Sequence, residues 1–440
     1  MQAKYTQYLC SFIIVLASIR GAFIYHLQLP SNLTYTLTGL LLVCFGLLSF
    51  RMMWINKTDP ALILLDKAIK TNALLLSFYM PILMIGISFN QYIVTYFFAI
   101  FPIIFTLVKY DERLLNGIVY IITSVTTFGI IYFNNMGISG GIEAIQEAHE
   151  ILREDFEYSR IGENLLPAGY QGSHHDAASI LVMCGVFFFS KVTLSKRMTK
   201  YFTLTIYFVI FYAITLTGST TNIIIMQLIS ICILLLLAKN NPLLIAFILL
   251  LLAIFASKFS DKFYFIDKLN YNQDTLEGGG IFNSLDINSI LASFHTILIG
   301  FGYIFEVPMI HSEIAFLKIL ISFGLIPFLI LMFICFSPVY YIHKFRKTGN
   351  IQARFLRNHI TGISTANFIK TNRTYKLRLI LTAMPVLAGT LTLLHYGSLF
   401  RITSIGLFCV FIALFFKEYL AINKLREIQF IALKLNAANK

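Results

Sequence analysis

The chain has 440 residues, of which 58% are hydrophobic and 12% charged, and its formal net charge at pH 7 is +13. Its mean hydropathy of +0.77 lies far outside the range of soluble domains. The composition therefore excludes a soluble domain and predicts an integral membrane protein.

Twelve segments are long and apolar enough, or nearly so, to cross a hydrocarbon core of about 30 Å, which takes roughly 20 residues. We therefore predict an all-α polytopic membrane protein with about twelve transmembrane helices in a single integral membrane domain, residues 1–440. The first segment has no cleavage pattern of small residues, so we expect it to be retained as a helix. The predicted spans are 7–26, 33–50, 73–89, 91–108, 115–133, 177–190, 201–217, 221–238, 242–257, 312–336, 379–397 and 402–416.

Basic residues alternate between the two sides of this topology. One side carries 26 of the 34 Lys and Arg residues and 6 of the 21 acidic residues, and the other carries 8 and 15. Lys and Arg favour the cytoplasmic side, so we place both chain ends there. The basic balance then reflects anionic lipid at the inner surface and does not predict a nucleic-acid partner.

Two long polar connections, 134–176 and 257–311, fall on the opposite, outer face. In the first, apolar spacing over 142–156 predicts an amphipathic surface helix, and Pro and Gly near its end predict turns. The second is too polar to span and too apolar for free solution, which predicts re-entrant or interfacial short helices. On the inner side, 337–378 is strongly basic without clear periodicity, and we predict a lipid-facing cytoplasmic loop.

Histidines stand where each outer connection returns to the membrane. His174 and His175 precede Asp176, and His311 precedes Glu313. A histidine beside a carboxylate can act as a general base near neutral pH. Alternatively, the first group caps a helix, with Ser173 at the N-cap, and His311 is an interfacial histidine.

Outer-face arginines are candidates for binding a pyrophosphate, because a guanidinium binds phosphate through two parallel hydrogen bonds. Arg153 and Arg160 lie in the first outer connection, and Arg20 and Arg401 lie near the outer ends of the first and last spans. Alternatively, the loop arginines form salt bridges with neighbouring acids, and those in the spans extend to the membrane surface.

The sequence gives no sign of a metal or other cofactor. All six cysteines lie inside predicted helices without metal-ligand spacing, so neither a disulfide framework nor a zinc site is expected. Phosphate-loop and dinucleotide fingerprints are absent as well. Residues 216–222, LTGSTTN, predict an outer helical hairpin capped by Ser219 or Thr220.

Four segments in order resemble the O-antigen polymerase and ligase superfamily. They are Arg160 to Gly172 followed by HHDAASIL, the LTGSTTN hairpin, the turn Gly300-Phe301-Gly302, and the helix that begins HSEIAFL at His311. The resemblance covers about residues 150–336. The chain departs from the family pattern in two places. Position 220 is Thr, where the family usually has Arg or Lys, and the segment before the turn has no arginine, whereas ligase-like members often have one there.

The resemblance implies a multi-pass enzyme of the bacterial inner membrane, a metal-independent glycosyltransferase acting at the periplasmic face. It would polymerise repeat units linked to undecaprenyl pyrophosphate into O-antigen or capsular polysaccharide, with His311, His174 or His175 as the base. An arginine, or a cluster of Lys258, Lys262 and Lys268, would hold the pyrophosphate. Its partners would be the lipid-linked donor and acceptor, membrane lipid and a chain-length regulator protein.

Three alternatives remain open at this stage. A ligase would transfer the finished glycan to a lipid core, although the modest loops and the missing arginine favour a polymerase. A flippase or other transporter would need polar groups along a path through the bilayer midplane. A membrane scaffold would leave the helices that begin with histidines unexplained.

Overall fold

The computed structural model describes residues 2–55, 59–86, 100–137, 160–161, 164–165, 167–171, 173–194, 197–238, 246, 298, 315–359, 363–394 and 402–438. The described helices are α1 (Gln2–Leu27), α2 (Ser31–Ile55), η1 (Pro60–Leu62), α3 (Ile63–Gly86), α5 (Ile103–Leu107), α6 (Glu112–Asn135), α8 (His174–Leu194), α9 (Arg197–Leu216), α10 (Thr220–Ala238), α16 (Ala315–Phe323), α17 (Leu325–His359), α18 (Ile363–Leu391), η6 (Thr392–Leu394) and α19 (Ile402–Ala438). Two short strands, β1 (Arg160–Ile161) and β2 (Asn164–Leu165), pair antiparallel. The rest of the described secondary structure is helical.

Eight described helices are long and apolar enough to cross a membrane, and α10 adds a shorter apolar helix at Thr221–Leu236. The chain is therefore an all-helical, multi-pass membrane protein, as predicted. The predicted span 242–257, apart from residue 246, and the first half of 91–108 lie outside the described residues. So do the expected surface helix at 142–156 and nearly all of 257–311.

Two expectations about residues 312–378 differ from the structure. The predicted span 312–336 is divided at Gly324, whose positive φ of 79° ends α16 before α17 begins. The predicted loop at 337–378 is helical apart from 360–362, which lie outside the described residues. Leu, Ala, Arg, Lys and Gln favour helix even where the pattern is not apolar, so α17 and α18 continue through this basic stretch.

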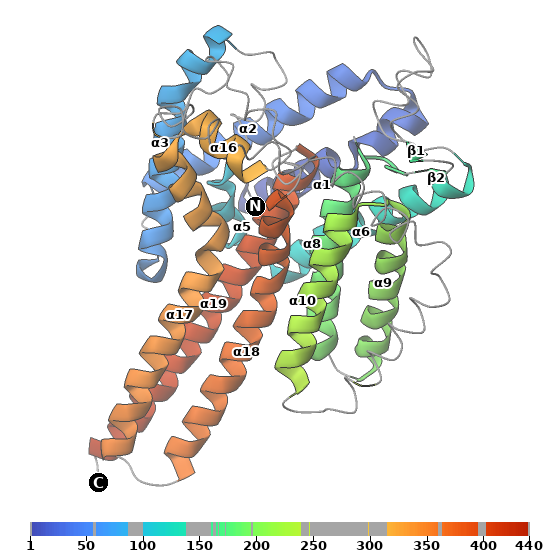
Figure 1. Ribbon diagram of the computed structural model, residues 1–440. Helices are drawn as coiled ribbons and strands as arrows, with labels where there is room; N and C mark the ends of the chain where they lie inside the picture. The colour runs from blue at the N-terminus through green and yellow to red at the C-terminus, as the bar shows by residue number, and fades with distance from the viewer. Residues whose placement is uncertain are drawn as a thin grey trace.

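Helix α8 lies at the centre of the described fold and packs against α6, α9, α10, α18 and α19 (Figure 1). It is almost wholly buried from Asp176 to Ser190. Two glycines allow close packing around it. An added Cβ at Gly185 would lie 2.6 Å from Met226, and one at Gly389 of α18 would lie 2.7 Å from Met183.

Charged residues from distant parts of the chain meet at one end of the apolar helices. Lys191 of α8 contacts Glu112 of α6 at 3.4 Å, and Arg378 of α18 contacts Glu418 of α19 at 2.6 Å. Lys417 donates a hydrogen bond to the carbonyl oxygen of Tyr110. These contacts bring together segments that the sequence assigned to the cytoplasmic side.

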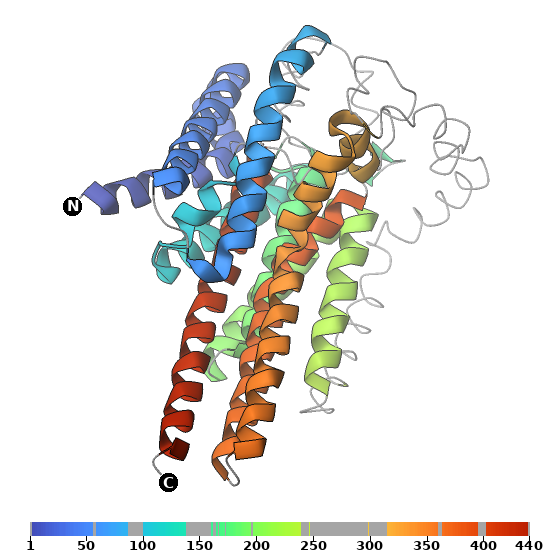
Figure 2. The same ribbon diagram turned by 90° about the vertical axis from the view of Figure 1, so that its left-hand side faces the viewer.

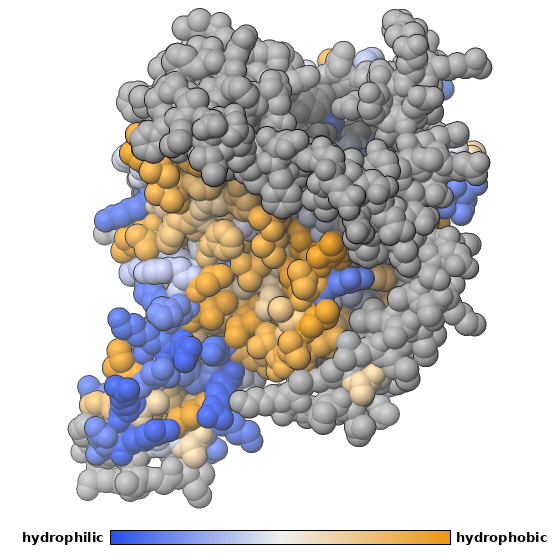
Figure 3. Space-filling view, viewed as in Figure 1, coloured by the Kyte–Doolittle hydropathy of each residue, from blue (hydrophilic) through white to orange (hydrophobic). Residues whose placement is uncertain are grey.

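Beyond these contacts, α17, α18 and α19 continue together past the ends of α8, α9 and α10, and the C-terminus lies at this end (Figures 1 and 2). We call residues 343–359, 363–378 and 417–438 the stalk. It contains thirteen Lys and Arg residues and two Glu residues. In Figure 3 hydrophilic residues predominate on the coloured part of the stalk, and an apolar band lies above them.

Arg426 holds the stalk together from inside. It is 2% exposed, it donates hydrogen bonds to the Phe345 carbonyl oxygen (2.7 Å) and to Asn423 Oδ1 (2.6 Å), and its guanidinium lies 4.1 Å from the Phe345 ring centroid. Nearby, the rings of Phe355 and Phe368 lie within 6.4 Å of the Phe430 ring. The stalk is thus a packed three-helix unit.

Replacing Arg426 with alanine is expected to destabilise the stalk by about 2–4 kcal/mol, because two charge-assisted hydrogen bonds and a cation–π contact are lost. Limited trypsin digestion of the purified protein should then cut the stalk faster. Lys424→Ala, a change at an exposed neighbouring cation, is the matched control and should leave the digestion rate near that of the parent. Equal protection of the two variants would contradict this role for Arg426.

Candidate functional site at the start of helix α8

The first turn of α8 carries the predicted histidine pair. Ser173 stands at the N-cap, and its hydroxyl accepts a hydrogen bond from the Asp176 backbone N–H at 3.3 Å. The rings of His174 and His175 lie 3.9 Å apart and are partly exposed, whereas Asp176 is 1% exposed. The predicted cap is therefore present, and a buried carboxylate directly follows two partly exposed imidazoles in the first turn of the helix.

The hairpin between α9 and α10 supplies the next part of the site. Gly218 has a positive φ of 63°, which lets the chain turn between Leu216 and Thr220. Ser219 follows it and is buried, and its Oγ lies 3.2 Å from His175 Nδ1. Asn222 Nδ2 donates to the same Oγ at 2.9 Å. Two segments that the sequence only suggested were related, HHDAASIL and LTGSTTN, are therefore in direct contact.

Residues 167–171, immediately before α8, are buried against α1 and α6. Gly169 has a positive φ of 61°, and an added Cβ there would lie 2.8 Å from the backbone nitrogen of Ile130. Next to it, the Tyr170 ring occupies the space over Gly129, where an added Cβ would lie 2.5 Å from the ring. The end of the first outer connection is thus fixed on α6.

Two polar side chains of this segment reach α1. Gln171 Nε2 donates to the Ser18 carbonyl oxygen at 2.9 Å and to Thr126 Oγ1 at 3.3 Å. The Tyr170 hydroxyl lies 2.8 Å from His26 Nε2. Burial raises the pKa of Tyr170, so its hydroxyl stays protonated at neutral pH and can donate to the imidazole. These contacts link α1, α6 and the start of α8.

The predicted phosphate-binding arginines are only partly described. Arg20 lies on α1 two residues beyond Ser18 and is buried, at 6% exposed. Arg160 begins β1, where its backbone pairs with that of Leu165. The remaining predicted site residues lie outside the described residues; they are His311, Glu313, Arg153 and Arg401. The structure therefore brings His175 to the hairpin and does not test the convergence of the arginines.

Comparison with protein families and with curated proteins identifies no relative. No protein-family model matches the chain, and no curated protein matches it at a significant level. The resemblance to the O-antigen polymerase and ligase superfamily therefore stays a prediction based on the motifs. Within the described residues, no group of three His, Cys, Asp or Glu side chains could hold a metal ion, and all six cysteines are free.

Sequence reasoning missed Gln171, Tyr170 and His26. The only local signal for Tyr170 and Gln171 is that YQGS directly precedes the histidine pair, and polar residues next to a candidate site are common. His26 lies far from this segment in the sequence and has no such signal. The contact between Gln171 and Ser18 joins residues 153 positions apart. Such a contact follows from packing between helices and has no periodicity that a single sequence could reveal.

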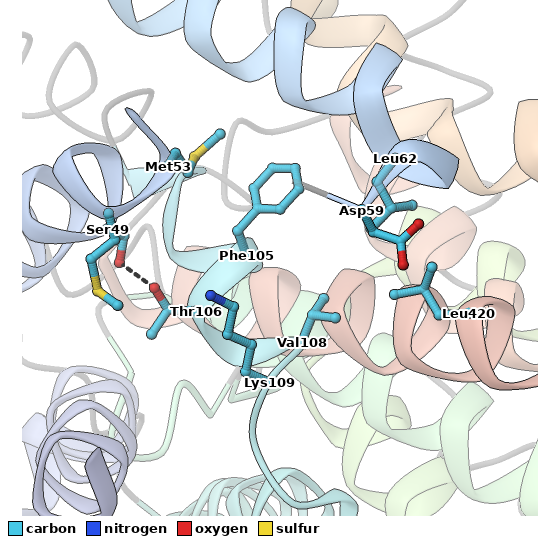
Figure 4. Close-up of a pocket in the computed structure, with 10 residues that line it drawn as sticks. Ser49, Met53, Asp59, Leu62, Phe105, Thr106, Val108, Lys109 and Leu420 are labelled. Carbon is cyan, nitrogen blue, oxygen red and sulfur yellow. Dashed lines mark hydrogen bonds between the residues drawn. The ribbon is translucent and has the colours of Figure 1, made fainter. Parts of the chain in front are cut away.

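A cavity of about 150 Å³ lies elsewhere, between the end of α2, η1, α5 and α19 (Figure 4). The Ser49 and Thr106 hydroxyls hydrogen bond across one side at 2.8 Å, and Lys109 and Asp59 also line it. Ligand pockets usually enclose about 300–1,000 Å³, so this cavity is too small for an oligosaccharide. It contains none of the predicted site residues.

Replacing Gln171 with methionine is expected to lower the stability by about 1–3 kcal/mol, because a buried donor that serves α1 and α6 is lost. The measurement is the thermal midpoint of the detergent-purified protein. Gln429→Met, at a partly exposed position of the stalk, is the control. A midpoint for Gln171→Met as high as that of the control would show that the contact with Ser18 contributes nothing.

Proposed function

We propose that the protein is a glycosyltransferase that polymerises oligosaccharide repeat units linked to undecaprenyl pyrophosphate. The observation that carries the proposal is the contact between His175 Nδ1 and Ser219 Oγ. It joins two of the four segments on which the family resemblance rests, although 44 positions separate them. In this proposal the buried Asp176 and the hydroxyl of Ser219 orient the imidazole, as in other histidine bases.

The reaction would take place at the periplasmic face of the bacterial inner membrane. Support comes from the separation of the two ends of the helices. The Lys191–Glu112 and Arg378–Glu418 pairs lie at the end assigned to the cytoplasm, together with the basic stalk. His175 lies in the first turn of α8, whereas Lys191 lies in its last turn. Sixteen residues separate the two, so the candidate site is about 24 Å from the basic end at 1.5 Å per residue.

The proposed chemistry is a direct displacement. An acceptor hydroxyl attacks the anomeric carbon of the donor, a new glycosidic C–O bond forms, and the bond to the lipid pyrophosphate breaks. His175, or His311, takes the proton of the hydroxyl, and the pyrophosphate leaves with the electron pair of the broken bond. Arginines such as Arg20 and Arg160 would stabilise that leaving charge. The pyrophosphate supplies the energy, so the proposal needs no nucleotide.

To test the proposal, purified protein in nanodiscs is incubated with a lipid-linked repeat unit, and the glycan products are analysed by length. A ladder of longer lipid-linked glycans supports the polymerase. Product that appears only when a lipid core acceptor is added identifies a ligase. Movement of the substrate across the bilayer without any new glycosidic bond identifies a flippase, and absence of all three products rejects this class of function.

A further inference from the structure

The part of α19 in the stalk has two apolar faces. One face holds Tyr419 and Ile422, each 2% exposed and turned toward α17 and α18. The opposite face carries a row of exposed residues, which we call the outer seam: Ala421, Leu425, Ile428, Ala432 and Leu435. Leu425, Ile428 and Leu435 are 49%, 54% and 60% exposed. A helix with one buried face needs only one apolar stripe, so the fold does not account for the second.

The spacing of the outer seam is that of a coiled coil. Its members alternate intervals of four and three residues from Ala421 to Leu435. This alternation places apolar side chains along one line of a helix and is the pattern that packs against a second helix. The outer seam is therefore shaped for one further helix.

Charge selects the kind of helix. The stalk has thirteen basic and two acidic residues, and the charged residues next to the seam are Lys424, Lys434 and one acid, Glu427. A second copy of the chain would bring an equally basic stalk into contact, which like-charge repulsion disfavours. An amphipathic helix with acidic flanking residues would gain both apolar burial and charge complementarity.

The position of the seam disfavours lipid as its occupant. Lys417 is the first charge after an uncharged run from Ile402 to Phe416. Leu435 lies eighteen residues further along α19, about 27 Å at 1.5 Å per residue. The headgroup layer extends only about 5–8 Å beyond the hydrocarbon core. Most of the seam thus stands in water.

We infer that the outer seam of α19 docks an acidic amphipathic helix of a partner protein on the side of the membrane where the stalk projects. This interaction is independent of the proposed glycosyl transfer, since the stalk lies at the opposite end of the helices from His175. Apolar residues of the partner pack on Leu425, Ile428 and Leu435, and its carboxylates lie against Lys424 and Lys434.

The test measures binding of synthetic helices to the full chain in nanodiscs made of zwitterionic lipid. One peptide has Leu at the heptad core positions and Glu at the flanking positions, and a matched peptide has Lys in place of Glu. We expect the Glu peptide to bind, more weakly as salt rises, and the Lys peptide not to bind. The double variant Leu425→Gln/Ile428→Gln should weaken binding at least tenfold. Ile351→Gln, which changes an equally exposed residue of α17 at 60%, is the control and should not weaken it.

Several results would overturn the inference. Equal binding of the Lys peptide would show that charge does not select the partner. No binding of the Glu peptide would contradict docking of an acidic helix. Light scattering that shows a dimer of the chain lost in Leu425→Gln/Ile428→Gln would assign the seam to a second copy. Recruitment of anionic vesicles that needs the same two residues would assign it to lipid. Glycan elongation by this variant should equal that of the parent, so failure of the docking inference and of the proposed function are separable.

Discussion

His175→Ala is expected to lower the rate of glycan elongation by about 10²–10⁴-fold, the usual contribution of a positioned general base. The imidazole lies at the accessible start of α8, where its Nδ1 contacts Ser219 Oγ and the adjacent carboxylate of Asp176 is buried. In the proposed reaction, its loss removes the group that takes the proton of the acceptor hydroxyl. The measurement is single-turnover elongation of a lipid-linked repeat unit by purified protein, normalised to folded protein.

Two comparisons make this prediction specific. His343→Ala, at an exposed position of the stalk, should leave the rate unchanged. Ser219→Ala should retain more activity than His175→Ala, because it removes a contact that orients the ring and keeps the base. A parent-like rate in His175→Ala would transfer the role to another residue, of which His311 is the first to test.

Among glycine-to-alanine substitutions in the described part of the chain, Gly169→Ala should lower the stability most. The residue has a φ of 61°, a left-handed conformation that costs a residue with a Cβ about 1–2 kcal/mol. The new Cβ would also lie 2.8 Å from the Ile130 backbone nitrogen, and a helix backbone cannot rotate away as a side chain can. We expect a loss of at least about 2 kcal/mol, seen as a lower thermal midpoint. Displacement of Gln171 from Ser18 should also reduce elongation.

Gly117→Ala provides the matched control. Gly117 lies within α6, the helix on which Gly169 packs, and an added Cβ there would meet nothing within 4 Å. Alanine favours helix over glycine by about 0.5–1 kcal/mol, so this variant should be as stable as the parent or slightly more stable. If Gly169→Ala matched Gly117→Ala in thermal midpoint, the close approach of residues 167–171 to α6 would be contradicted.

The sequence predicts the helices better than their ends. A run of apolar residues identifies α1, α2, α6 and α19, because only a helix satisfies its backbone within lipid. The same reasoning failed for residues 337–378, where the helices leave the apolar band. There Phe345 packs against the guanidinium of Arg426 from α19, and a core built in this way gives no hydropathy signal. The helix propensity of these residues, summed over the stretch, predicts the helices that hydropathy does not.

For the site, the sequence predicted the residue types and not their neighbours. His174, His175 and Asp176 were predicted from a histidine pair beside a carboxylate, and the hairpin from LTGSTTN. That His175 meets Ser219 depends on how α8, α9 and α10 pack together, which no local pattern encodes. Gln171 was missed for the same reason. The convergence of Arg160 and His311 with this group stays a prediction.

The close packing of methionines on glycines around α8 bears on whether the protein or the glycan would move during the proposed glycosyl transfer. Met226 fits over Gly185, and Met183 fits over Gly389, so sliding α8 along either neighbour would drive a thioether into a backbone. A helix packed in this way is rigid relative to its neighbours, so the imidazoles in its first turn keep a fixed position. In the proposed glycosyl transfer, a growing glycan would therefore be advanced by exchange of its lipid carriers in the plane of the bilayer, past stationary imidazoles.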